Sequence, residues 1–88
     1  MTTVHFTING RVQGVGFRRY VMHHAQRLGL RGYVCNTDDY VECVAQGNVD
    51  ALTELETCIR TGPTLASVAD ITCNDINDDR VYHGFRIL

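Results

Sequence analysis

The chain has 88 residues and a mass of 9.9 kDa, which is room for one domain. All eight of its basic residues are arginine, and the absence of lysine excludes Schiff-base enzymes and Walker-type phosphate loops. Five of these arginines and no acidic residue fall in residues 1–37, whereas all ten acidic residues fall in residues 38–88. This separation of charge indicates an anion-binding face, for which nucleic acid is the first candidate.

A change in the spacing of apolar residues predicts a strand, a loop and a helix at the start of the chain. Apolar and polar residues alternate over 4–8, which predicts a half-buried strand. Residues 10–16 form a loop punctuated by glycine, and from residue 17 to 28 apolar side chains recur at helical spacing. Gly29 then ends the predicted helix.

A hairpin and a second helix are predicted for the middle of the chain. Two strands over 32–36 and 41–45 are separated by turn residues at 37–40. Asn48 is a good N-cap for the helix that follows, and Gly62-Pro63 ends it. The apolar stripe of this helix consists of Leu52, Leu55 and Ile59.

A fourth strand over 68–73, a polar connection over 74–79 and a short last strand over 81–88 complete the chain. The order is β-α-β-β-α-β with a short terminal strand. This order predicts an α+β, ferredoxin-like split βαβ sandwich, in which two helices cover one face of a mostly antiparallel sheet. We expect a single domain over residues 1–88.

The four cysteines are far apart and form no C-x-x-C pair, so we expect free, largely buried thiols rather than disulfides or a zinc site. They are Cys35, Cys43, Cys58 and Cys73.

His23 and His24 fall within the first predicted helix, where packing at the edge of the core explains them better than metal binding does. The first residues lack a signal-peptide pattern and no apolar run could cross a membrane, so the expected location is the cytoplasm.

The segment from Gly10 to Arg18 is the strongest candidate for chemistry. Its three glycines let backbone amides turn inward to bind an oxyanion, and the loop leads into a helix N-terminus. Arg18 can bind a phosphate-sized anion through two parallel hydrogen bonds. The alternative is a glycine-rich turn with two solvated arginines. The candidate phosphate-binding loop comprises Arg11, Val12, Gln13, Gly14, Val15, Gly16 and Phe17.

Asn36 is the second candidate, at the end of the second predicted strand. Asparagine there is commonly a turn former. A β-α-β unit, however, is expected to bring the second strand next to the first, so that the glycine loop and Asn36 share a cleft. The cleft would then offer an arginine, a set of amides and one neutral amide side chain to a phosphate and a water molecule.

Residues Gly10–Arg18 resemble the signature of the acylphosphatase family, and the similarity continues through 28–36, Gly62-Pro63 and 85–87. The resemblance implies a hydrolase without metal or cofactor that cleaves the carboxyl–phosphate bond of acyl phosphates. In that family Arg18 would bind the phosphate and Asn36 would orient the attacking water. Inorganic phosphate or sulfate would compete with the acyl phosphate substrate, and the enzyme would act as a monomer without nucleic acid or membrane partners.

The turn between Asn36 and Val41 departs from the family pattern. It is one residue shorter and has Tyr40 where glycine is expected, so the turn must be of another type. The short turn also resembles the acylphosphatase-like domain of hydrogenase-maturation carbamoyltransferases. A non-catalytic domain that binds acyl or carbamoyl phosphate is therefore the alternative. RNA binding is disfavoured, because His5, Thr7 and Asn9 occupy the outward positions of the first strand, where aromatic residues would be expected.

Overall fold

A computed structural model describes residues 1–77 and 79–88. The chain order is β1 (Thr2–Arg11), α1 (Phe17–Arg27), β2 (Arg31–Asn36), β3 (Val41–Gly47), α2 (Val49–Thr61), β4 (Ser67–Asp75) and β5 (Phe85–Ile87). The predicted order of elements and the ferredoxin-like α+β fold are confirmed.

The five strands form one sheet in the order β4-β1-β3-β2-β5. All neighbouring strands are antiparallel except β2 and β5, which run parallel at one edge. The expectation that the second strand lies next to the first is wrong. β3 pairs with both β1 and β2 and therefore separates them, as the hairpin that it forms with β2 requires.

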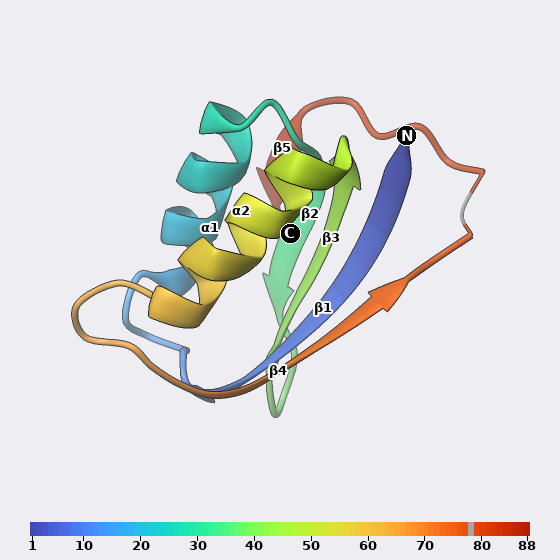
Figure 1. The fold of residues 1–88 in the computed structure, drawn as a ribbon. Helices are drawn as coiled ribbons and strands as arrows, with labels where there is room; N and C mark the ends of the chain where they lie inside the picture. Colours follow the sequence, from blue (N-terminus) through green and yellow to red (C-terminus); the bar gives the residue numbers. More distant parts are fainter. Residues whose placement is uncertain (78) are drawn as a thin grey trace.

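Both helices cover the same face of the sheet, as predicted (Figure 1). The core lies between them and the sheet, and each helix contributes the apolar stripe seen in its sequence. Phe6, Ile8 and Val34 of the sheet pack there and are at most 1% exposed. The two helices are joined by the hydroxyl of Tyr20, which donates a hydrogen bond to the carbonyl oxygen of Cys58 at 2.7 Å.

The helix ends follow the predicted signals. The Oδ1 of Asn48 accepts a hydrogen bond from the amide of Ala51 at 2.9 Å, which caps the N-terminus of α2. At the C-terminus of α1 the amide of Gly29 donates to the carbonyl of Gln26, and Gly62 caps the end of α2.

Strand boundaries differ from the prediction at polar positions. β1 continues through Gly10 and Arg11, which pair with β4 after a register shift, although we expected these residues in the loop. The alternation of apolar residues marks only the buried part of a strand, whereas pairing continues wherever a neighbouring strand is present. β4 likewise extends to Asp75, into the predicted polar connection 74–79, of which Asp78 lies outside the described residues.

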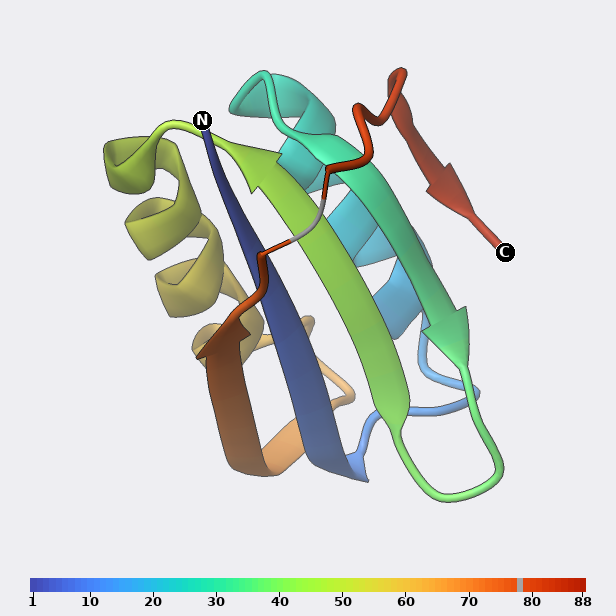
Figure 2. The same ribbon diagram turned by 90° about the vertical axis from the view of Figure 1, so that its right-hand side faces the viewer.

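In the described part of the chain no helix covers the second face of the sheet, and the described residues between β4 and β5 cross that face (Figure 2). Gln46 of β3 holds this crossing segment: its Nε2 donates to the carbonyl of Arg80 at 2.8 Å, and its Oε1 accepts from the amide of Tyr82 at 3.1 Å. The prediction that the last strand begins at Val81 is wrong: these contacts hold residues 80–82 to the sheet face, and the strand comprises only Phe85–Ile87. This segment delivers β5 to the edge beside β2.

Candidate active site

A cavity of about 330 Å³ lies at the N-terminal end of α1, beside β5. Five of the nine predicted site residues line it, together with two residues that were not predicted. The predicted ones are Val12, Gly14, Gly16, Phe17 and Arg18, and the additional ones are Arg19 and Ile87. The cavity therefore forms where the glycine loop, the start of a helix and an edge strand meet.

The loop conformation depends on two glycines. Gly14 and Gly16 have φ angles of 75° and 77°, in the left-handed region that side chains disfavour. A Cβ atom at either position would meet no neighbour within 4 Å, so the backbone conformation, rather than lack of space, requires glycine.

The amides of this loop are available to a ligand. Within the described structure, the N–H groups of residues 13–19 donate no hydrogen bond, and the first donor of the helix is Tyr20, to the carbonyl of Gly16 at 3.1 Å. Gly16 is the N-cap residue of α1, and no side chain caps the helix. Such a run of unpaired amides at a helix N-terminus is a binding site for an oxyanion.

The charge of the cavity is positive. Arg18 is half-buried in its wall, and Arg19 lines it from an exposed position. The first turn of α1 contains no acidic residue, and no carboxylate of the described residues forms a salt bridge with either arginine. Two cations at the positive end of a helix dipole repel the helix terminus, so a bound anion would stabilise this arrangement.

Asn36 ends β2 and does not line the cavity. It pairs with Val41 and lies on the helix side of the sheet, two residues beyond the buried Val34. Gln13 connects the loop to the turn that follows: its Nε2 donates to the carbonyl of Thr37 at 2.9 Å and to that of Tyr40 at 3.3 Å. The loop and the end of β2 are thus joined through the hairpin turn, and not through neighbouring strands as we expected.

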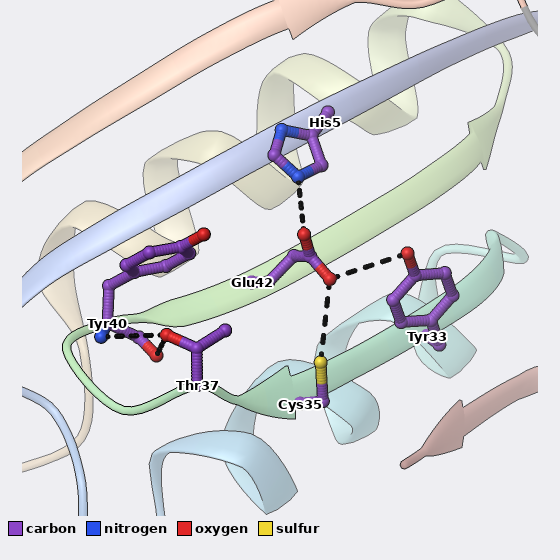
Figure 3. A network of polar contacts seen from close by, with 6 residues as sticks. All are labelled: His5, Tyr33, Cys35, Thr37, Tyr40 and Glu42. Carbon is purple, nitrogen blue, oxygen red and sulfur yellow. Dashed lines mark hydrogen bonds and ion pairs between the residues drawn. The ribbon is translucent and has the colours of Figure 1, made fainter.

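The turn itself is closed by Thr37 and Tyr40 (Figure 3). The Thr37 hydroxyl donates to the carbonyl of Tyr40 at 2.9 Å and accepts from its amide at 3.1 Å. No non-glycine residue in the described part of the chain has a positive φ, and Tyr40 is therefore accommodated without backbone strain. The expectation that Tyr40 avoids the positive φ that a glycine would supply is confirmed.

Glu42, which follows this turn on β3, faces the helix-free side of the sheet. It accepts hydrogen bonds from His5 at 2.9 Å, Tyr33 at 3.5 Å and Cys35 at 3.6 Å (Figure 3). Burial and the Glu42 charge raise the pKa of the Cys35 thiol, while the Arg18 guanidinium acts in the opposite direction. Since Glu42 and Asn36 lie on opposite faces of the sheet, Glu42 is not placed to act as a base beside Asn36.

The four cysteines are free, as expected. The expectation that they are largely buried is wrong for Cys73, which is exposed, and it holds fully for Cys43.

The ring of His24 packs against the ring of Tyr20 at a centroid distance of 4.6 Å. Among the described residues, no three metal-binding side chains come together in a way that could hold a metal ion. In the same part of the chain, no helix combines the length and apolar character needed to span a bilayer.

Comparison with known proteins gives one consistent result. The acylphosphatase family model matches residues 4–87. An acylphosphatase from Chlorobaculum tepidum is 42% identical over 86 residues, which cover 97% of this chain and 94% of the relative. The crystal structure of acylphosphatase from Bacillus subtilis has a TM-score of 0.96 at 34% identity and covers 100% of this chain and 99% of that one. Full-length HypF in its phosphate- and nucleotide-bound form matches with a TM-score of 0.92 at 27% identity, over 12% of its chain.

Proposed function

The chain belongs to the acylphosphatase family, and we propose that it hydrolyses the carboxyl–phosphate bond of acyl phosphates in the cavity at the start of α1. The observation that carries this proposal is the run of unpaired amides at residues 13–19, which lies at a cavity lined by Gly14, Gly16 and Arg18. The products are a carboxylate and inorganic phosphate.

Arg18 and the loop amides hold the phosphoryl group. The loop supplies donors along one side, and the Arg18 guanidinium supplies two parallel donors from the first helical turn. Negative charge on the non-bridging oxygens is spread in the transition state of phosphoryl transfer, and these donors stabilise it there. A metal is not needed for this role, and activity should survive EDTA.

Asn36 orients the attacking water in this proposal. It lies outside the lining of the cavity, and what supports the role is the link that Gln13 makes between the loop and the turn directly after Asn36. The water oxygen forms a bond to phosphorus while the bond from phosphorus to the bridging oxygen breaks, and the electron pair leaves with the carboxylate. A carboxylate is a good leaving group and needs little acid catalysis. The proton of the water passes to a non-bridging oxygen of the substrate's own phosphate, because neither Arg18 nor Asn36 is a general base and no carboxylate lines the cavity among the described residues. Catalysis thus consists mainly of positioning and charge stabilisation.

The same geometry supports the remaining parts of the proposal. Inorganic phosphate or sulfate competes with substrate, since the loop binds the phosphoryl oxygens and makes few contacts beyond them. The proposal includes a single domain that acts as a monomer, and it is supported by a cavity whose described lining comes from one chain: Val12, Gly14, Gly16, Phe17, Arg18, Arg19 and Ile87. Four free thiols suit a reducing compartment such as the cytoplasm.

Phosphate release from benzoyl phosphate, measured against spontaneous hydrolysis, tests the activity. Arg18→Ala should abolish both turnover and phosphate binding. Asn36→Ala should lower turnover by roughly 100-fold or more, the size of effect expected when a reacting group is misplaced, while phosphate still binds. Phosphate binding without release above background in the wild-type chain would favour the non-catalytic alternative.

A further inference from the structure

The candidate active site contains a second cation to which the proposed mechanism gives no role. Arg18 and Arg19 both line the cavity of about 330 Å³, and the phosphoryl group is assigned to Arg18 and the loop amides. No carboxylate in the described part of the chain forms a salt bridge with Arg19. The first turn of α1 has no acidic residue either. The charge of Arg19 is therefore available to a ligand.

The two arginines differ in their position in the cavity wall. Consecutive residues of an α-helix are rotated by about 100° around the helix axis, so the two side chains leave the first turn in different directions. Arg18 is half-buried, whereas Arg19 is exposed. The half-buried guanidinium suits the phosphoryl group at the loop. The exposed guanidinium is left to contact a part of the substrate that lies nearer to the solvent, which is the acyl group.

The remaining lining can accommodate an acyl group between these two cations. Val12, Phe17 and Ile87 are apolar, and Ile87 of the edge strand β5 is 37% exposed, so it offers an apolar surface to a ligand. The volume of this cavity is at the low end of the range for ligand pockets, about 300–1,000 Å³, which leaves room for a short chain or a single ring beside the phosphoryl group. The cavity thus combines an oxyanion site, an apolar surface and a second cation.

From this arrangement we propose that the preferred substrates are acyl phosphates whose acyl group carries a second carboxylate, which Arg19 binds. The inference rests on the proposed hydrolysis and names its substrate class. A guanidinium binds a carboxylate through two parallel hydrogen bonds. The chemical step does not change: the bond between phosphorus and the bridging oxygen breaks, and the product leaves as a dicarboxylate. Arg19 determines specificity and does not contact the reacting atoms.

Two benzoyl phosphates of similar size test the preference. para-Carboxybenzoyl phosphate carries the second carboxylate, and para-methylbenzoyl phosphate has a methyl group in its place. After correction for spontaneous hydrolysis, kcat/KM should be about fivefold higher for the carboxylated compound, which is the effect of one exposed ion pair. The preference should decrease in about 1 M salt, because the charge of an exposed arginine is screened.

Arg19→Gln removes the charge, keeps the backbone amide, and should bring the ratio of the two kcat/KM values close to one. The loss of a cation from a helix N-terminus should not destabilise α1. Arg31→Gln is the matched control, because Arg31 is an exposed arginine that does not line the cavity. Both variants change the net charge equally, so general electrostatic attraction would alter the ratio equally in both, whereas a local contact alters it only in Arg19→Gln.

Binding of stable phosphonates separates this inference from the proposed hydrolysis. para-Carboxybenzylphosphonate should bind the wild type about fivefold more tightly than para-methylbenzylphosphonate, and Arg19→Gln should bind both equally. If this difference holds while neither benzoyl phosphate is hydrolysed above background, the proposed hydrolysis is wrong and the ligand preference stands. The inference is wrong if the wild type binds both phosphonates equally, or if Arg31→Gln reduces the preference as much as Arg19→Gln does.

Discussion

The link between the phosphate loop and the hairpin turn yields the most direct test of how the candidate site is positioned. Gln13 reaches from the loop to the carbonyl oxygens of Thr37 and Tyr40, one residue and four residues beyond Asn36. Its side chain is exposed and fills no part of the core. Gln13→Ala therefore removes these two hydrogen bonds and little else.

The expected size of the effect follows from the two bonds. A neutral hydrogen bond contributes about 0.5–1.5 kcal/mol, and exposure of Gln13 places each bond near the lower end of that range. Their combined loss of roughly 1–2 kcal/mol, if it acts on the position of Asn36, lowers kcat by about 5-fold to 30-fold. Phosphate binding should change by less than about threefold, because the amides of residues 13–19 and Arg18 remain.

Steady-state kinetics with benzoyl phosphate, together with the inhibition constant of inorganic phosphate, separates these two effects. Gln26→Ala is the control, because this glutamine donates one comparable hydrogen bond, to the carbonyl of Phe85 at 3.3 Å, near the other end of α1. An equal loss of kcat and phosphate affinity in Gln13→Ala would show that Gln13 serves the anion site instead. A kcat within twofold of the wild type would refute the proposed role of the link.

Three further predictions concern conformation and stability. Gly16→Ala forces a side chain into the left-handed region and should lower the free energy of unfolding by roughly 1 kcal/mol and weaken phosphate binding, as urea unfolding and phosphate titration will show. Asn48→Ala removes the cap of α2 and should cost about 1 kcal/mol without changing kcat. Burial, and after it the charge of Arg27, which donates a hydrogen bond to His24 Nδ1, lower the pKa of His24. The unfolded chain therefore binds more protons than the folded chain below about pH 6.5, so the free energy of unfolding should decrease as the pH falls through that range. His24→Gln should flatten this pH dependence in thermal unfolding, and an unchanged dependence would contradict the prediction.

The sequence predicts the elements of this fold well because their signals are local. Alternating and helical periods identify the buried faces, and Asn48 and Gly29 mark helix ends through contacts within a few residues. Pairing between distant strands is not local. The insertion of β3 between β1 and β2 changes no period in the sequence, and the parallel partner of β5 depends on where the crossing segment is held by Gln46.

The candidate site shows the same limit. The glycines and Arg18 are recognisable because they are consecutive, and the unpaired amides follow from the conformation that Gly14 and Gly16 adopt. Ile87 reaches the cavity from the opposite end of the chain, which no spacing could indicate. Gln13 falls in the predicted loop, but its contacts with the turn depend on a tertiary approach of two segments.

Charge along the sequence and charge in space differ in this protein, and the difference bears on where anions bind. Of the five arginines in the acid-free residues 1–37, only Arg18 and Arg19 line the cavity at the start of α1, and Arg27 forms an ion pair with Glu54 of α2 at 3.2 Å. Net charge by segment therefore does not locate the anion site. The local balance of cations and carboxylates around that cavity does, and it favours one small anion there rather than an extended nucleic-acid surface.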